Sequence, residues 1–480
     1  MVTPVPPPPS KEPSKALRVG LIAAAILLLV LAWMITSVML ATPGANPSLR
    51  AEFMALPESV QPDPTVPNRY PDLVAKLAAF DAIIEQVKAE AQPVLDERSV
   101  TDFIYTSVID FRALAPASEA DESDATTPEG LELQKRYTQE ALDRMDRAGL
   151  FDDIAEILRS PNLANPYEAG IDEKGESRAL YLWEMPELGR MRYFSLAQIA
   201  RARMARENGK PHEAAELLAQ IAPLPVVLTR QATVIEHLVG YAIAELVLTE
   251  ARAIATDPAA DTSTLTTLER AIEPLNRLNT PQIAFEGERL GSRDAHDRTH
   301  TSGGRLIPSA QDRFMSEIGF EEDTSSEPGT LARLADIRGY AYASRGASLD
   351  LMNTYYTKIT NAIDETNPAT RETLITDADR MAEEVSWRYP LPRVLLPALG
   401  KFVEQWYTIQ HSVAVTQIIL AMAEYRLGNG DWPESLDQIV PDYLNTVPID
   451  PQTGDPFEYE HTPGQPPTLE SFGPKNEIED

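Results

Sequence analysis

The stretch LAQIARARMARENGKPHEAAELLAQI, residues 196–221, decides the fold class of this chain. On both sides of Asn208-Gly209, apolar and small residues recur every three or four positions, which is the spacing of an amphipathic helix. An Asn-Gly pair typically ends a helix, and Pro211 is tolerated in the following first turn because a backbone N–H there would be unpaired. The stretch therefore predicts two helices joined by a short turn.

The two expected helices resemble one helix–turn–helix unit of the tetratricopeptide type. In such a unit, small residues at the crossing let the helices approach closely, and Ala214 and Ala215 suit that place. No second copy follows at a fixed period. We therefore expect one helical hairpin in the body of the protein and no repeat array.

Helical spacing continues over most of the chain. Further helices are expected over 71–91, 179–207, 226–255, 265–278, 329–365, 370–389 and 394–427. Strand spacing occurs only after Pro448. We therefore predict a mainly α fold, with a multi-helix ectodomain over 71–428 and a small α+β C-terminal module with a β-hairpin over 429–480.

The composition limits the classes of partner. The 480 residues include 73 acidic and 42 basic side chains, a net charge of −31 with neutral histidines. So acidic a chain repels phosphate backbones, and we expect no nucleic-acid partner. Cysteine is absent, which excludes disulfides, thiolate nucleophiles and cysteine-bound metals.

An uncharged run of 23 residues, Val19 to Ala41, predicts a membrane-spanning helix. At about 1.5 Å per residue, such a helix crosses the roughly 30 Å of hydrocarbon in a bilayer. Lys11, Lys15 and Arg18 precede the run, and basic flanks stay on the cytoplasmic side. A cleaved signal peptide is the alternative, but the run exceeds the usual apolar region of about 7–15 residues.

These features together predict a topology. Residues 1–18 form a cytoplasmic Pro-rich tail, 19–41 a transmembrane helix and 42–70 a linker to the ectodomain. The expected location is the inner membrane, crossed once as a signal-anchor, with the acidic, all-α body in the periplasm or elsewhere outside the cytoplasm.

The segment FEGERLGSRDAHDRTHTSGGR, residues 285–305, is the candidate metal site. His296 and His300 are four residues apart, which on a helix puts both rings on one face. Asp297 and Glu286 can add carboxylates, and two histidines with a carboxylate are a recognised metal set. No HExxH motif is present, and the Ser and Gly residues favour a polar loop as the alternative.

Other catalytic patterns are absent from the sequence. There is no GxSxG nucleophile elbow and no Gly-rich phosphate-binding motif. The remaining histidines, His212, His237, His411 and His461, are isolated, and structural or exposed roles are expected for them. Whether the chain is an enzyme stays uncertain, and we favour a protein without catalysis.

The last fifty residues carry the most specific pattern. After GNGDWPESLDQIV, residues 428–440, a turn fixed by prolines leads to alternating residues of a strand and then to a second strand over 468–472. This ending resembles the C-terminal module of major pseudopilins (protein G) of type II secretion systems. The matching residues are Pro448, Asp450, Pro451, Gly454, Pro456, Tyr459, Ser471 and Gly473.

The resemblance implies a calcium-binding loop after the Ser-Gly step. The oxygen donors available there are Asn476, Glu477 and Glu479, although the glycines that shape such a loop are missing. The leader does not support processing as a pilin, because Ala25 stands where Glu is required after Gly20. No other cofactor is expected.

The chain also resembles a group of uncharacterised single-pass bacterial envelope proteins with this ending. The matching stretches are VIEHLVGYAI (234–243), FEGER (285–289) and AMAEYRLGNGDWPESL (421–436). This resemblance implies a topology and no activity.

Three functions follow as hypotheses. The first is a non-catalytic, membrane-anchored envelope protein that acts through an envelope protein partner, with a possible link to a type II secretion or pilus-like assembly. The second is a metal-dependent envelope hydrolase that uses residues 286–300. The third is a module that binds a periplasmic ligand between its helices.

Overall fold

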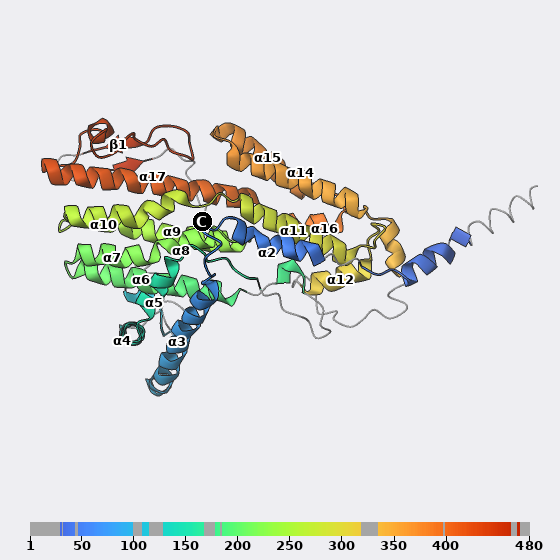
Figure 1. Cartoon of the computed structure of the whole chain (residues 1–480), viewed down its shortest axis with the longest axis horizontal. Helices are drawn as coiled ribbons and strands as arrows, with labels where there is room; N and C mark the ends of the chain where they lie inside the picture. Colours follow the sequence, from blue (N-terminus) through green and yellow to red (C-terminus); the bar gives the residue numbers. More distant parts are fainter. Residues whose placement is uncertain are drawn as a thin grey trace, which may run out of the picture. The chain divides into compact units, whose positions relative to one another are not determined.

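The protein is described from a computed structural model of the chain (Figure 1). The structure describes residues 29–30, 32–43, 47–98, 108–114, 128–167, 178–182, 185–317, 335–396, 399–461 and 468–470. The chain divides into two compact units: unit 1 comprises 1–46, 293–351 and 385–395, and unit 2 comprises 47–292, 352–384 and 396–480. The division falls inside two helices, α11 (Gln282–Thr299) and α14 (Arg345–Asp364).

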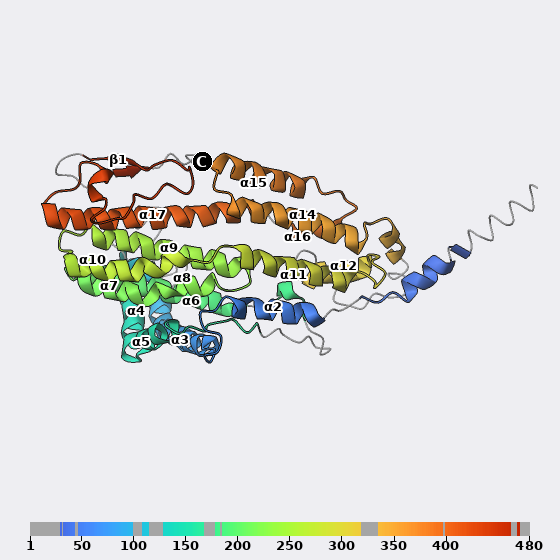
Figure 2. The same ribbon diagram turned by 45° about the horizontal axis from the view of Figure 1, so that its top comes forward.

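Unit 2 is built mainly from helices. In chain order they are α2 (Pro47–Ser59), α3 (Tyr70–Arg98), α4 (Pro128–Arg147), α5 (Leu150–Leu158), α6 (Pro186–Glu207), α7 (Pro211–Ile221), α8 (Pro223–Leu228), α9 (Val234–Ala255), α10 (Thr262–Ile272), α15 (Pro368–Glu383) and α17 (Leu399–Asn429). Short 3-10 turns lie at η1 (Phe111–Leu114), η2 (Leu180–Leu182), η3 (Glu273–Arg277) and η5 (Leu436–Ile439). Helix α6 packs on α7, α7 packs on α10, and α9 contacts α6, α8 and α17 (Figures 1 and 2).

The helical hairpin is where the sequence predicts it. Helix α6 ends at Glu207, the next residue caps it, and Gly209 adopts the left-handed conformation at φ 72°. Helix α7 starts at Pro211, and Ala214 and Leu218 on its inner face are fully buried. The structure is therefore mainly helical, as the spacing indicated.

The single helix expected over 226–255 is two helices. Helix α8 ends at Leu228, and α9 begins after Thr233, whose side chain accepts a hydrogen bond from the backbone N–H of Glu236. The Glu236 carboxylate accepts one from the backbone N–H of Thr233 in return, which completes a capping box. This reciprocal pair defines the start of α9, and an apolar pattern alone does not show it.

Besides the helical residues 29–30 and 32–39 and the ends of α11 and α14, the described part of unit 1 contains further short elements. These are α12 (Pro308–Glu317), η4 (Asp336–Tyr340) and α16 (Pro390–Leu395). The buried carboxylate of Asp336 accepts hydrogen bonds from the backbone N–H of Ser309 at 2.7 Å and from its hydroxyl at 2.6 Å. These bonds satisfy donors in the first turn of α12 and link it to η4.

The prediction of a transmembrane helix over 19–41 is wrong. Within the part of the chain that the structure describes, no helix combines the length and the apolar character needed to cross a bilayer. Residues 19–28 and 31 lie outside the described residues, and the helical stretch 32–39 covers only about 12 Å. Its end contacts protein, since the Ser37 hydroxyl lies 2.5 Å from that of Tyr340 and Val38 is buried. The single-pass inner-membrane location that was predicted from this helix is therefore wrong as well.

The linker expected over 42–70 contains a helix. Helix α2 occupies residues 47–59, and its Leu49 and Phe53 are buried in a cluster with Tyr167 and Leu290. A segment rich in proline therefore contributes to the core of unit 2.

The prediction of an α+β C-terminal module with a β-hairpin is also wrong. The helical part of this region is a single 3-10 turn, η5. Strands β1 (Glu458–Glu460) and β2 (Thr468–Glu470) pair antiparallel but have three residues each, and residues 462–467 between them lie outside the described residues. Trp432 and Phe457 are buried within unit 2, so no separate module is evident.

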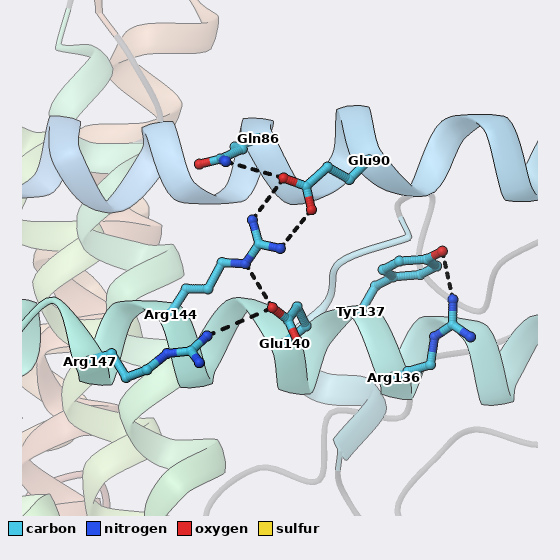
Figure 3. A network of polar contacts seen from close by, with 7 residues as sticks. All are labelled: Gln86, Glu90, Arg136, Tyr137, Glu140, Arg144 and Arg147. Atoms are coloured by element: carbon cyan, nitrogen blue, oxygen red, sulfur yellow. Dashed lines mark hydrogen bonds and ion pairs between the residues drawn. The ribbon is translucent and has the colours of Figure 1, made fainter.

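A surface network joins α3 to α4 (Figure 3). Arg144 on α4 reaches both oxygens of Glu90 on α3, at 2.9 and 2.6 Å, and its Nε donates to Glu140 at 2.8 Å. These acceptors raise the pKa of Arg144, and the guanidinium lowers the pKa of Glu90. The network therefore links two helices at the surface.

Candidate functional site

The proposed metal-binding histidines lie on a helix, not in a loop. His296 and His300 belong to the end of α11 and the residue after it, and both are buried. Their rings stack with centroids 5.5 Å apart and an angle of 19° between planes. The Nδ1–H of His300 donates to the backbone carbonyl of His296 at 2.9 Å. Burial, together with the neighbouring His296, lowers the pKa of His300 to about 3.

The carboxylates expected to complete this site face arginines. Asp297 pairs with Arg345 at 2.8 Å, and Glu286 pairs with Arg289 at 2.5 Å. Glu286 is also ten residues before His296, about 15 Å along a helix. Among the described residues, no three His, Asp or Glu side chains lie close enough together to hold a metal ion. The metal site stays a prediction, and the calcium donors Asn476, Glu477 and Glu479 lie outside the described residues.

Glycine explains why the loop interpretation of α11 was wrong. A Cβ atom on Gly287 would lie 1.8 Å from the backbone oxygen of Ala232, and one on Gly291 would lie 3.1 Å from the Tyr181 ring. These glycines therefore allow close packing inside a helix, and they do not mark a turn. The FEGER stretch thereby packs against the residues that precede VIEHLVGYAI.

Beside this contact lies a closed set of polar side chains, the Glu236 network, which comprises Asn165, Tyr167, Thr233 and Glu236. The Glu236 carboxylate accepts hydrogen bonds from the Tyr167 hydroxyl at 2.6 Å, the Asn165 amide at 2.9 Å and the Thr233 hydroxyl at 2.7 Å. Tyr167 adopts a positive φ of 42° and accepts a hydrogen bond from Ala232 N–H at 2.7 Å. A strained residue of this kind persists because its surroundings hold it firmly.

The network could titrate near neutral pH but is sealed. Burial raises the pKa of Glu236 to about 7, although its hydrogen-bond donors oppose the shift. The next residue, His237, is also fully buried, and desolvation lowers its pKa to about 4. The side chains of Asn165, Tyr167 and Glu236 are all buried. We assign the network to stability.

The candidate functional site is a groove between α9, α17 and strand β2 with a volume of about 310 Å³. Its wall consists of Arg252 on α9, Leu469 on β2, and a strip of α17 formed by His411, Ser412, Val415, Ile419 and Met422. We call this the α9–α17 groove. All of these residues belong to unit 2. The strip follows helical spacing, so one face of α17 lines the groove.

One end of the groove is polar. The His411 Nδ1–H donates to Asp450 Oδ1 at 2.9 Å, and the Asp450 side chain is 1% exposed. The buried carboxylate thus orients the ring, as a carboxylate does beside many functional histidines. Within the described residues, neither the other ring nitrogen of His411 nor the Ser412 hydroxyl makes a hydrogen bond.

Arg252 provides the positive charge of the groove. Its Nη1 donates to the Thr416 hydroxyl at 3.1 Å, and its Nη2 donates to Glu245 at 3.0 Å and to Thr249 at 2.9 Å. These contacts fix the guanidinium between α9 and α17. The side chain keeps 22% of its surface exposed, so a ligand can reach it.

The C-terminal segment is held against α17 and α15 by the turn that the sequence singled out. Asp450 Oδ1 accepts from the backbone N–H of Gln452 at 2.8 Å, which closes the turn. The Gln452 side chain donates to Thr408 on α17 at 2.9 Å, and its carbonyl accepts from the Arg371 guanidinium at 2.6 Å. This anchoring places the buried Asp450 beside His411.

Sequence reasoning identified Asp450 in a rigid turn and missed its partner. His411 is 39 residues earlier, in the middle of a long helix, and appears isolated in the sequence. The available signal was an Asp-Pro turn after a helix that carries a histidine among apolar residues. That pattern is too common to indicate a contact by itself.

Comparisons with known proteins add no relative. No protein-family model matches the chain, and no curated protein or solved structure is significantly similar to it. The resemblances to the pseudopilin module and to the envelope group therefore stay predictions.

Proposed function

We propose that this protein binds a small molecule in the α9–α17 groove. The observation that carries the proposal is a cavity of about 310 Å³ whose polar end holds a fixed guanidinium, an oriented imidazole and a hydroxyl. Ligand sites are typically concave and largely apolar, with a few convergent polar groups and volumes from about 300 Å³ upward. The groove is at the small end of that range.

The construction of the groove supports the proposal. Three distant segments of the chain contribute to its wall: α9, α17 and β2. Val415 and Ile419 are only partly buried, although both are apolar and lie on the longest helix of the described chain. An apolar ligand would cover them, and removing apolar surface from water yields about 25 cal/mol per Å².

The other functions expected from the sequence stay predictions. A role in protein–protein interaction, with or without a secretion assembly, has no contact in the described structure that identifies a partner. A metal-dependent hydrolase would need ligands besides His296 and His300, since Asp297 and Glu286 are paired with arginines. Of these hypotheses, ligand binding in the groove is the one supported by a specific arrangement of side chains.

Filling the groove tests the proposal. The substitution Val415→Trp places an indole in the cavity, whereas Ile235→Trp adds the same side chain on an exposed part of α9, where Ile235 is 55% exposed. Both variants and the parent protein are screened against a library of small acids, alcohols and amines by thermal shift. We expect ligands that raise the melting temperature of the parent and of Ile235→Trp but not of Val415→Trp. The proposal fails if no compound stabilises the parent, or if Val415→Trp responds equally.

A further inference from the structure

The polar and apolar groups of the α9–α17 groove are segregated along α17. His411 and Ser412 lie at one end of the strip, and Arg252 reaches the same helix at Thr416. Beyond that point, the wall continues with Ile419 and Met422. A ligand that fills the groove therefore meets hydrogen-bonding groups with its head and apolar side chains with its tail.

We propose that the ligand is a carboxylate with a short unbranched apolar tail, whose head pairs with Arg252. This inference rests on the proposed function and specifies its ligand class. Arginine is suited to this role because its guanidinium stays charged, and Arg252 keeps its Nε–H and one Nη1–H for a carboxylate while Nη2 is engaged by Glu245 and Thr249. The Ser412 hydroxyl is a further donor beside it.

The charges around the groove favour a head with one negative charge. Among the described residues of the wall, Arg252 is the one arginine or lysine, and Glu245 at 3.0 Å already offsets part of its charge. At the far side of the His411 ring, the buried Asp450 carboxylate adds negative charge. A doubly charged phosphate head would face this carboxylate with one guanidinium to balance it, whereas a carboxylate head carries a single charge.

The volume sets the length of the ligand. At about 30 Å³ per non-hydrogen atom, the share of a water molecule in the liquid, a cavity of about 310 Å³ holds roughly ten such atoms. Octanoate has about this size. Octan-1-ol and octylamine have nearly the same shape with a neutral and a positive head, so the three compounds form a matched set.

Isothermal titration calorimetry of the full-length chain tests the inference. We expect octanoate to bind with one-to-one stoichiometry and at least about tenfold more tightly than octan-1-ol, because hydrogen bonds to charged groups are worth more than neutral ones. Octylamine should not bind measurably. Inorganic phosphate is titrated as well, and it should bind more weakly than octanoate.

Two arginine variants provide the control. Arg252→Gln should weaken octanoate binding about tenfold and leave octan-1-ol binding unchanged. Arg277→Gln removes an exposed arginine paired with Glu273 on η3 and should change neither. Circular dichroism and the melting temperature establish that each variant folds. If Arg252→Gln does not fold, Arg252→Lys replaces it. Octanoate binding should then be weakened less by Arg252→Lys than by Val415→Trp.

The outcomes separate the two proposals. If octan-1-ol binds as tightly as octanoate, or if Arg252→Gln leaves octanoate binding unchanged, the ligand class is wrong while the groove still binds ligands. If no compound binds and the thermal-shift screen is also negative, the proposed function itself fails. If phosphate binds more tightly than octanoate, the head group is wrong.

Discussion

The Glu236 network and the α9–α17 groove each contain a buried carboxylate, Glu236 in the network and Asp450 beside the groove. The two regions differ in whether a ligand can reach their polar side chains. In the network, Glu236 accepts hydrogen bonds from Asn165, Tyr167 and Thr233, and the side chains of Glu236, Asn165 and Tyr167 are buried. In the groove, Asp450 holds one nitrogen of His411, and the rest of the ring lines a cavity.

The difference shows that a buried titratable group does not by itself mark a functional site. A carboxylate whose pKa is raised is a frequent sign of a functional site. Here Glu236, whose pKa is raised by burial, lies in the closed region, whereas the groove is identified by its cavity. Access to a cavity therefore decides between the two. Four substitutions probe the closed region, the C-terminal segment beside the groove and, for contrast, a surface network.

The largest effect is expected at the edge of the closed region. Gly287→Ala puts a Cβ atom 1.8 Å from the Ala232 backbone oxygen, so α11 must shift away from the network. We expect a loss of about 3 kcal/mol or more in the free energy of unfolding, measured by urea denaturation. The matched control is Gly189→Ala on α6, where a Cβ atom meets nothing within 4 Å. It should be neutral or stabilising by about 0.5–1 kcal/mol. Equal effects would contradict close packing at Gly287.

The second effect is a pH dependence from Glu236. Burial raises the pKa of this group from 4.5 to about 7, so the folded chain binds the proton more tightly than the unfolded chain. This contribution to stability is fully present below pH 4.5, and stability falls by about 3 kcal/mol as the pH rises from 4.5 to about 7. His237, with its pKa lowered to about 4, acts in the opposite direction between pH 4 and 6.5.

Glu236→Gln isolates the carboxyl contribution. The free energy of unfolding is measured by chemical denaturation at pH 5 and pH 8 for both chains. We expect the parent protein to lose about 3 kcal/mol more than the variant between these values. Glu216→Gln, on an exposed glutamate of α7, is the control and should follow the parent. An identical pH dependence in Glu236→Gln would show that the network does not hold the proton.

The third effect is local to the C-terminal segment. Asp450→Ala leaves the Nδ1–H of His411 and the backbone N–H of Gln452 without this acceptor, at a cost of about 1–3 kcal/mol. We expect faster hydrogen exchange over 449–460, by about tenfold or more, with little change in α6 and α7. Asp455→Ala, on an exposed residue of the same turn, should leave the exchange unchanged. Faster exchange throughout the chain would mean that the segment is part of the global folding unit.

The smallest effect concerns the surface network of Figure 3. Arg144→Gln removes the pairs with Glu90 and Glu140, which lie in water. We expect the melting temperature to fall by no more than about 2 °C in low salt, and the difference to vanish at 1 M salt. A larger decrease that persists in salt would show that the network supports the packing of α3 on α4.

The sequence predicted helices where local signals suffice. The capping residue Asn208, the left-handed Gly209 and Pro211 are adjacent in the chain, so the boundary between α6 and α7 could be inferred from them. The mistaken regions depend on distant partners. Gly291 packs on Tyr181, more than a hundred residues earlier, and without that partner a glycine indicates a loop.

The same reason explains the errors at the two ends and at the groove. An apolar run predicts that its side chains are buried, but it does not show whether lipid or protein buries them. In the structure, Val38 of this run is buried in unit 1. The short strands β1 and β2 follow the expected alternation, but the apolar residues before them pack into unit 2 and form no separate module. The groove needs α9, α17 and β2 together, and no pattern within one of them reveals it.

The most direct test of a ligand-binding groove is the methyl resonance of Met422 in a protein labelled with ¹³C at the methionine methyl groups. Met422 lines the groove, whereas Met145 is fully buried in α4, away from it. On titration with octanoate, we expect a saturable shift of the Met422 signal and none at Met145, with both signals unchanged in Val415→Trp. An unmoved Met422 signal at saturating octanoate, or equal shifts at both methionines, would contradict it.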